Sequence, residues 1–243
     1  MDGSPGPAAV NRTTVGAIIP AYFEEKHVGD VVERTLRQLD NVLVVDDGST
    51  DATAANARAA GAEVIVHEKN LGKGETIKSG FRHWLARGLS HVIILDGDGQ
   101  HLPEEISRFI AAAPTGPELF IGTRMNDVRD MPLVRRIANR YMSSRISRLC
   151  GQEIPDTQCG FRMLSAKIIP DLLHGTAHFE YETEMLIVVS RKGYRIGAVP
   201  ISTVYSDEVS SIHPVRDTIR FLKLMRRYER EARSTATAAR AAA

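Results

Sequence analysis

Short apolar runs alternate along the chain with longer segments in which apolar residues recur every three or four positions. The short runs are rich in valine and isoleucine, as buried strands are, and the longer segments have the period of amphipathic helices. The pattern predicts strands at 15–20, 41–45, 63–66, 92–95, 119–122, just after Gly160, at 194–199 and at 201–205. It predicts helices at 28–39, after 51, at 75–87, at 133–149, after the strand near 160, and at 181–192. This alternation indicates an α/β fold, a mostly parallel sheet with helices on both faces.

The two ends of the chain lack this alternation. Residues 1–13 and the Ala/Thr/Arg-rich tail at 233–243 are predicted to be disordered, and 14–212 is predicted to form one domain. Between them, 213–232 has the pattern of a basic amphipathic helix, with Val215, Ile219, Leu222 and Met225 on its apolar side. Such a helix lies on an anionic membrane surface, or docks on its own domain or on a partner.

Composition narrows the class of protein. The 243 residues are 43% hydrophobic and 25% charged, which is ordinary for a globular protein, and the net charge of +1 gives no reason to expect a nucleic-acid partner. No stretch resembles a signal peptide or reaches the roughly 20 apolar residues that span a bilayer. Cys150 and Cys159 show no metal or disulfide spacing, as expected of a cytosolic protein. We therefore expect a soluble or peripheral protein.

The most informative polar segment, Asp96-Gly97-Asp98-Gly99-Gln100, follows the predicted strand at 92–95. In an open α/β sheet, ligands bind at the edge where the parallel strands end. Two carboxylates and an amide oxygen at that edge suit Mg²⁺ or Mn²⁺, provided that a substrate diphosphate supplies the remaining ligands. The alternative interpretation is an Asp/Gly turn with solvated carboxylates.

A second acidic segment, Asp46-Asp47-Gly48-Ser49-Thr50-Asp51, follows the strand at 41–45. Its later residues can cap a helix, but capping does not explain two adjacent acids before the glycine. Carboxylates at this edge can accept hydrogen bonds from a nucleobase or a ribose. The glycine fingerprint of dinucleotide folds and the Walker motif are both absent, so a metal ion is expected to neutralise any bound phosphates.

Seven motifs follow one another between 15 and 205: IIPAYFEE, VLVVDDGSTDAT, NLGKG, ILDGDGQH, GTR, DTQCGFRML and FEYETEM. In this order they resemble the family 2 glycosyltransferases of GT-A fold, a Rossmann-like fold. Within that family they are most similar to dolichyl-phosphate mannose synthases and polyprenyl-phosphate glycosyltransferases. The resemblance implies a metal-dependent, inverting transfer of a hexose from a nucleotide sugar of GDP-mannose or UDP-glucose type to a polyprenyl or dolichyl phosphate. It also implies a peripheral enzyme at the cytoplasmic membrane face, with room for a membrane-anchored partner subunit.

The resemblance also implies roles for individual residues. The nucleotide pocket would comprise Pro20, Tyr22, Glu24, Asp46, Asp47, Asp96 and Gly97, and the metal ligands would be Asp96, Asp98 and Gln100. The acceptor phosphate would be held by Arg124, Arg135 and Asn139, and catalysis would depend on Asp98, Arg124 and Arg135. A phosphate acceptor is already mostly ionised at pH 7, so it needs placement rather than a general base.

The segment after 205 departs from the family pattern. Relatives carry Arg and Lys on a loop there, whereas 206–213 holds neither and contains two acids, which leaves His213 or Arg216 to close over the phosphates. Asp156 could orient Arg162, approach the acceptor or cap a loop.

Three rival functions therefore stay open. The first is a glycosyltransferase with a soluble hydroxyl acceptor and Asp156 as its general base. The second is a sugar-phosphate nucleotidyltransferase, although its glycine-rich phosphate loop is absent. The third is a catalytically silent subunit that binds nucleotide sugars.

Overall fold

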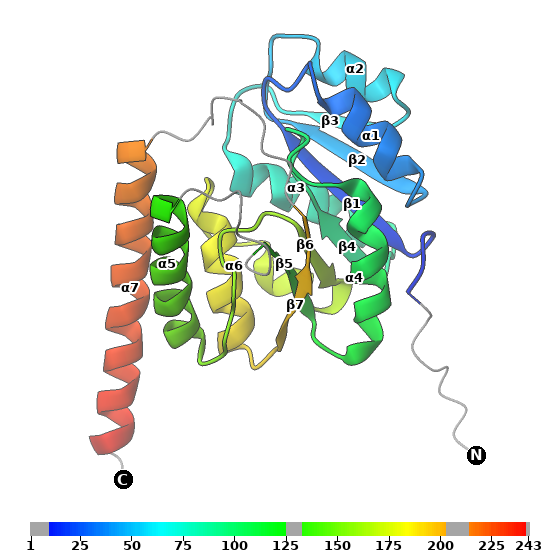
Figure 1. Cartoon of the computed structure of the whole chain (residues 1–243). Helices are drawn as coiled ribbons and strands as arrows, with labels where there is room; N and C mark the ends of the chain where they lie inside the picture. Colours follow the sequence, from blue (N-terminus) through cyan, green and yellow to red (C-terminus); the bar gives the residue numbers. More distant parts are fainter. Residues whose placement is uncertain (1–9, 125–132, 203–213, 242–243) are drawn as a thin grey trace, which may run out of the picture.

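The computed structural model describes residues 10–124, 133–202 and 214–241. A seven-stranded sheet runs through the molecule, with helices packed on both of its faces (Figure 1). In chain order the strands are β1 (Val15–Ala21), β2 (Asn41–Asp46), β3 (Glu63–Val66), β4 (His91–Ile94), β5 (Leu119–Thr123), β6 (Arg162–Ser165) and β7 (Ile196–Pro200). The predicted strand at 201–205 is wrong where it can be checked: Ile201 and Ser202 are not in a strand, and 203–205 lie outside the described residues.

The helices occupy the segments between the strands. They are α1 (Val28–Leu36), α2 (Thr53–Ala59), α3 (Lys73–Ala86), α4 (Ile106–Ala112), α5 (Leu133–Cys150), α6 (Glu180–Arg191) and α7 (Pro214–Ala241). Three 3₁₀ turns, η1 (Pro103–Glu105), η2 (Ala113–Thr115) and η3 (Ala166–Leu172), complete the connections. The short helix α4 was not predicted from the sequence pattern.

The strand order, β3-β2-β1-β4-β6-β5-β7, determines where a ligand can bind. From β1 the chain moves outward to β2 and β3, and then returns to place β4 on the other side of β1. These four strands are parallel, and β6 runs antiparallel to β4 and β5. The predicted α/β fold with a mostly parallel sheet is thus confirmed. Because the order reverses at β1, the ends of β1 and β4 are where an open sheet of this kind binds its ligand.

Close packing fixes α3 against the centre of the sheet. Every residue of β1 is buried, because helices cover both faces of the sheet. The indole Nε1 of Trp84 donates a hydrogen bond of 3.0 Å to the carbonyl oxygen of Ala17. A Cβ on Gly80 would lie only 2.6 Å from Ile18, so glycine lets the helix approach this closely. The start of α3 is therefore held at the carboxyl edge of the sheet.

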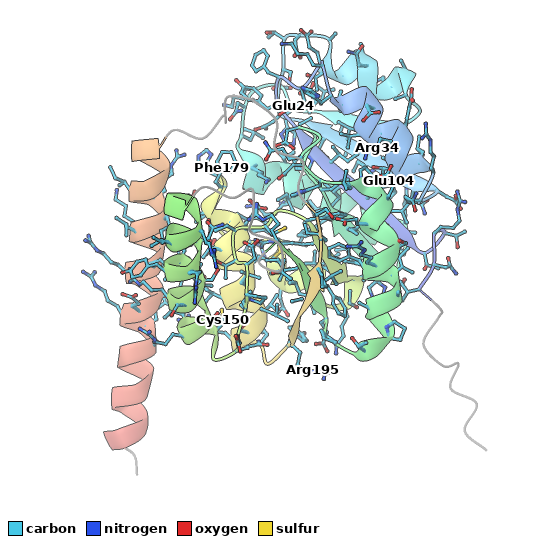
Figure 2. All side chains as sticks on the ribbon, in the orientation of Figure 1. Glu24, Arg34, Glu104, Cys150, Phe179 and Arg195 are labelled. Atoms are coloured by element: carbon cyan, nitrogen blue, oxygen red, sulfur yellow. The ribbon has the colours of Figure 1, made fainter. Side chains whose placement is uncertain are left out.

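An ion pair from α1 anchors the segment after β4. Arg34 of α1 makes two hydrogen bonds to Glu104, of 2.9 Å from Nε and 2.7 Å from one terminal nitrogen. Figure 2 shows Arg34 and Glu104 side by side. This forked ion pair ties η1, and with it the end of the loop that follows β4, to the first helix.

The C-terminal helix packs on the domain and is longer than predicted. It lies beside α5 and α6 at one side of the molecule (Figure 1) and continues to Ala241, through most of the segment predicted to be disordered. Leu224, Met225 and Tyr228 are buried, whereas Ile219 and Leu222 are 48% and 38% exposed. The predicted apolar side is thus divided between the domain's own core and solvent.

The N-terminal segment also differs from the prediction of disorder at 1–13. Arg12 pairs with Asp40, and Val10 packs against the core, so the chain is ordered from residue 10. Residues 1–9 lie outside the described part. No helix in the described residues is both long enough and apolar enough to cross a membrane.

Candidate active site

The loop after β4 lies at the point where the strand order reverses. Gly97 sits against β1, where an added Cβ would come within 3.4 Å of the Pro20 carbonyl oxygen. Gly99 has a φ of 74°, which favours glycine, and the Gln100 amide donates a 2.9 Å hydrogen bond to Asp98 Oδ1. The turn predicted as an alternative is therefore present. It also places the half-buried residues Asp96 and Asp98 at the edge of the sheet where β4 ends.

Lys73 and Glu182 complete this cluster, although the NLGKG motif favours a solvated loop lysine at position 73. Lys73, the first residue of α3, places its Nζ 2.7 Å from Asp96 Oδ1 and 3.1 Å from Glu182 Oε2. Burial alone would raise the pKa of Asp96, but the nearby Lys73 charge outweighs it and the pKa is lowered. Asp96 is therefore a carboxylate, as a metal ligand has to be.

His101 lies behind this cluster and is buried rather than exposed. Its ring stacks on Phe161 at a centroid distance of 5.3 Å, and its Nε2 is 3.7 Å from Asp96 Oδ2. Burial lowers the pKa of His101 to about 4, so the imidazole is neutral at pH 7. The neutral ring leaves Lys73 as the positive charge that faces Asp96.

The acidic pair after β2 is held by the chain itself. Asp46 accepts a 3.1 Å hydrogen bond from the Ser49 amide. Asp47 Oδ2 accepts 2.8 Å from the Gly72 amide, and its Oδ1 accepts 2.9 Å from the Leu71 amide and lies 2.7 Å from His67 Nδ1. Both oxygens of Asp47 therefore have partners within the chain, and Asp47 fixes the turn that precedes Lys73.

The other residues predicted for the nucleotide pocket follow β1 at the same edge. Tyr22 is 39% exposed, and its ring meets that of Phe23 at a centroid distance of 4.6 Å. The amide of Glu24 donates a 2.9 Å hydrogen bond to Thr53 Oγ1, which ties this segment to the start of α2. Glu24 and Phe179 lie toward the same end of the molecule, and Cys150 and Arg195 lie toward the other (Figure 2).

Arg124, at the end of β5, forms a forked ion pair with Asp156. Its Nε and one terminal nitrogen donate hydrogen bonds of 2.7 and 3.0 Å to the two carboxylate oxygens. Asp156 is fully buried, while the Arg124 side chain keeps 19% of its surface exposed. Of the roles predicted for Asp156, orienting Arg162 is wrong: Arg162 donates to main-chain carbonyls, and Asp156 orients Arg124 instead.

The segment from Asp156 to Phe161 connects this ion pair to the acidic loop. A Cβ on Gly160 would lie 2.6 Å from Asp96 Oδ2 and 3.3 Å from Glu182 Oε1. Glycine is needed there for the two carboxylates to come so close. The candidate metal ligand and the candidate acceptor arginine thus lie at the two ends of one short segment, which is buried except at Gln158.

Two other predicted residues are only partly placed. Asn139 is half-buried on α5, and the side chain of Arg135 lies outside the described part. The loop at 206–213, with His213, and the Arg216 side chain also lie outside it.

A spacing of two positions on a helix predicts that at most one of Glu182 and Glu184 points inward, but both do. They diverge as positions two apart on a helix must, Glu182 toward Lys73 and Glu184 toward α7. Glu184 accepts a 2.9 Å hydrogen bond from the Tyr228 hydroxyl and a further one from Arg227. Its other oxygen accepts 2.6 Å from the Thr176 amide. Glu184 therefore joins the C-terminal helix to the loop that packs against the start of α3.

The oxygen atoms at the end of β4 fit a hard divalent ion. Asp96 and Asp98 offer carboxylate oxygens from one tight turn, and the side-chain Oε1 of Glu182 is buried with no hydrogen-bond partner among the described residues. Within those residues, no three His, Cys, Asp or Glu side chains gather closely enough to hold a metal by themselves. A metal at this site needs further ligands from a substrate.

A mostly parallel sheet with a carboxylate turn at its switch point is the architecture of a GT-A glycosyltransferase. The chain belongs to the family described as "Glycosyl transferase family 2", whose sequence profile matches residues 17–173. The predicted resemblance is thus confirmed, and the protein is a glycosyltransferase.

The similar proteins include two named lipid-phosphate enzymes. The UDP-N-acetylglucosamine–dolichyl-phosphate N-acetylglucosaminyltransferase of Methanococcus voltae is 30% identical over 214 residues, covering 78% of this chain and 85% of that protein. The polyprenol monophosphomannose synthase of Mycolicibacterium smegmatis is 33% identical over 169 residues, covering 65% and 63% of the two chains.

Among solved structures, the glucosyl-3-phosphoglycerate synthase of Mycobacterium tuberculosis in complex with UDP matches with a TM-score of 0.69. The match covers 88% of this chain and 79% of that one at 18% identity. At this identity it supports the shared fold. Other structures of that synthase contain UDP with Mg²⁺ or Mn²⁺.

Proposed function

We propose that this glycosyltransferase transfers a hexose, with inversion and with the help of Mg²⁺ or Mn²⁺, from a nucleotide sugar to a polyprenyl or dolichyl phosphate. The observation that carries the proposal is the acidic turn at the switch point, joined by the segment 156–161 to the forked Arg124–Asp156 pair. A donor diphosphate would lie at the first and an acceptor phosphate near the second.

The donor half of the site is built to bind a nucleoside diphosphate. Asp96, Asp98 and Gln100 would hold the metal, which when bound neutralises the charge of the leaving diphosphate. Pro20, Tyr22, Glu24, Asp46 and Gly97 would line the pocket, and Asp47 would support it through the turn before α3. The relatives' names include both a UDP sugar and a mannosyl product, so a donor of GDP-mannose or UDP-glucose type is proposed without choosing the base.

The acceptor half favours a phosphate over a hydroxyl group. Arg124 presents a planar guanidinium whose orientation is fixed by Asp156, and such a fork matches phosphate oxygens. Asp156 is fully buried and already paired with that arginine, which is a poor position for a general base that has to reach a soluble acceptor. A phosphate needs no base, because its oxygens are already ionised. Arg135 and Asn139 would complete this half of the site.

A membrane surface is the proposed location, because one relative's name includes dolichyl phosphate and the other's a polyprenol monophosphomannose. Ile219 and Leu222 of α7 are exposed, and so are Ile137 and Tyr141 of the neighbouring α5, at 60% and 62%. Basic side chains of α7, among them the exposed Lys223 and Arg226, lie in the same stretch. This combination suits the surface of an anionic bilayer at the cytoplasmic face, with or without a membrane-anchored partner subunit.

A panel of donors and acceptors tests the proposed function. Purified protein with Mn²⁺ is supplied with GDP-mannose, UDP-glucose or UDP-N-acetylglucosamine, each with a polyprenyl phosphate, with soluble hydroxyl acceptors or with no acceptor. We expect one donor to be consumed rapidly only when polyprenyl phosphate is present. Consumption that depends on a soluble hydroxyl acceptor instead would support the rival glycosyltransferase.

A further inference from the structure

Lys73 occupies the place in this site where a metal ion would be expected to act. Its ammonium group bridges Asp96, from the turn after β4, and Glu182, from the first turn of α6, at 2.7 and 3.1 Å. Only 14% of the side chain is exposed. The ammonium group is thus a largely enclosed cation held between two carboxylates.

The backbone that carries Lys73 is fixed on three sides. The amide of Gly72 donates to Asp47, and Gly72 has a φ of 99°, which favours glycine. A Cβ at Gly72 would lie 2.2 Å from the His178 ring, and a Cβ at Gly74 would lie 2.8 Å from the Ala177 backbone. The Phe179 ring centroid is 5.8 Å from the lysine Nζ. The lysine thus projects from a fixed point between β4 and α6, and only its flexible side chain is free to move.

In this arrangement, Lys73 and a bound metal ion would compete for the carboxylate of Asp96. A Mg²⁺ or Mn²⁺ ligand oxygen lies about 2.1 Å from the ion, and Asp96 Oδ1 already lies 2.7 Å from the ammonium nitrogen. Two cations on that one oxygen would be no more than roughly 5 Å apart in a partly buried site, where like charges repel strongly. Additional negative charge is required to hold both of them, and a nucleoside diphosphate brings it.

We infer that Lys73 is an internal counter-cation of the donor site, which makes metal binding depend on the nucleoside diphosphate. Without a donor, Lys73 holds Asp96 and Glu182 together in place of the metal. When the metal arrives with a diphosphate, Lys73 gives up Asp96, keeps Glu182 and turns toward the diphosphate oxygens. The inference rests on the proposed function, because it requires that a metal–diphosphate pair binds here.

Binding of Mn²⁺, followed by the electron paramagnetic resonance signal of the free ion, tests the inference without measuring turnover. The ion is titrated into the full-length protein alone, and again with saturating UDP or GDP. For the wild type we expect weak binding of Mn²⁺ alone and at least about tenfold tighter binding with the accepted diphosphate, within the usual range of coupling between sites. For Lys73→Met we expect Mn²⁺ alone to bind at least about tenfold tighter than to the wild type, and the diphosphate to tighten binding by a smaller factor than in the wild type.

Two further variants separate loss of charge from general damage. Lys73→Arg retains the charge and should behave as the wild type does, whereas Glu182→Gln also breaks an ion pair of Lys73 but should weaken the binding of Mn²⁺ alone. A thermal unfolding scan in EDTA verifies that each variant is folded, and Lys73→Gln replaces Lys73→Met if the latter is not.

The outcomes also separate the inference from the proposed function. If the wild type binds Mn²⁺ together with a diphosphate but Lys73→Met binds Mn²⁺ alone no more tightly than the wild type, the inference is wrong and the proposed donor site stands. If no variant binds Mn²⁺ under any condition, the inference and the metal-dependent function are both wrong.

Discussion

At the scale of single residues, Asp47 shows how a side chain predicted to contact the ligand can also support the backbone next to the binding site. Its carboxylate accepts hydrogen bonds from the amides of Leu71 and Gly72 and contacts His67. These bonds fix the turn from which Lys73 projects. A direct contact with the base or ribose stays a proposal, and the structure adds a supporting role for the same residue.

Replacing Asp47 should therefore affect stability as well as donor binding. Asp47→Ala leaves the Leu71 and Gly72 amides without their charged acceptor, and we expect it to lower the free energy of unfolding by about 2–4 kcal/mol. It should also weaken binding of the nucleoside diphosphate. Urea unfolding and calorimetry measure the two effects. Unchanged stability together with weakened binding would mean that Asp47 acts on the nucleotide alone.

The forked pair of Arg124 with the fully buried Asp156 determines which substitution is informative. Arg124→Ala would leave a buried carboxylate unpaired, at a cost of about 3–5 kcal/mol, and loss of folding would then obscure loss of function. Arg124→Lys keeps the charge but loses the fork. We expect it to reduce transfer to polyprenyl phosphate by at least about tenfold while the affinity for the nucleoside diphosphate stays within a factor of two.

Titration calorimetry and a lipid-transfer assay on that variant provide the measurement. The outcome that would move Arg124 from the acceptor to the donor diphosphate is a loss of nucleotide affinity with normal transfer at saturating donor.

At the scale of elements, Glu184 makes α7 part of the domain. Burial alone would raise the pKa of Glu184, but hydrogen bonds from the Thr176 amide and the Tyr228 hydroxyl, with the Arg227 charge, outweigh it and lower the pKa. A carboxyl group whose pKa is lower in the folded state stabilises the fold above its unfolded pKa, about 4.3 for glutamate. That contribution is lost as the pH falls through the folded value.

Glu184→Gln should remove this acid-dependent contribution. We expect the variant to be about 1.5–3 kcal/mol less stable than the wild type at pH 7, the usual value of hydrogen bonds to a charged group, and the difference to shrink below pH 4. Thermal unfolding between pH 7 and pH 3 measures it. A stability difference that is the same at both ends of this range would show that the carboxylate charge contributes nothing.

Because α7 contributes buried residues to the core, membrane binding is better tested by point substitution than by removing the helix. Ile219→Ser with Leu222→Ser changes two exposed side chains and should leave the unfolding temperature nearly unchanged. We expect the double variant to lose co-sedimentation with anionic vesicles at low salt. As a control, Val66→Ser removes an apolar side chain that is 45% exposed on β3, an edge strand of the sheet. This variant should bind the vesicles as the wild type does. Full-length protein that stays in the supernatant would show that α7 serves only its own domain.

At the scale of the whole molecule, local patterns determined what the sequence could predict. The buried runs of β1, β2 and β4, and the acidic turns that follow β2 and β4, are continuous in sequence, so their place at one edge of a sheet could be deduced. The site partners Lys73, Glu182 and Asp156 come from three separate segments. Their contacts depend on how α3, α6 and β5 pack, and no spacing in the sequence encodes that packing.

The C-terminal helix also shows the limit of prediction from a local sequence pattern. Its amphipathic period predicted a helix, but the period cannot distinguish a face that covers the domain from a face that meets a membrane. In the structure the apolar side of α7 has two parts: Met225 and Tyr228 are buried against the domain, and Ile219 and Leu222 are exposed. The buried portion depends on Glu184, a residue far away in the sequence.

We propose that the acidic turn after β4 holds the metal ion used in sugar transfer to a lipid phosphate. The most direct test measures incorporation of radiolabelled hexose into an organic-extractable product by the wild type and by Asp98→Asn, with polyprenyl phosphate and Mn²⁺. Asp98→Asn keeps the size of the side chain, so its fold should be intact. We predict incorporation by the wild type that stops reversibly with EDTA, and a loss of at least about 100-fold in Asp98→Asn, or about 2.7 kcal/mol of transition-state stabilisation. If folded Asp98→Asn protein incorporates as much hexose as the wild type does, the acidic turn does not hold the metal ion.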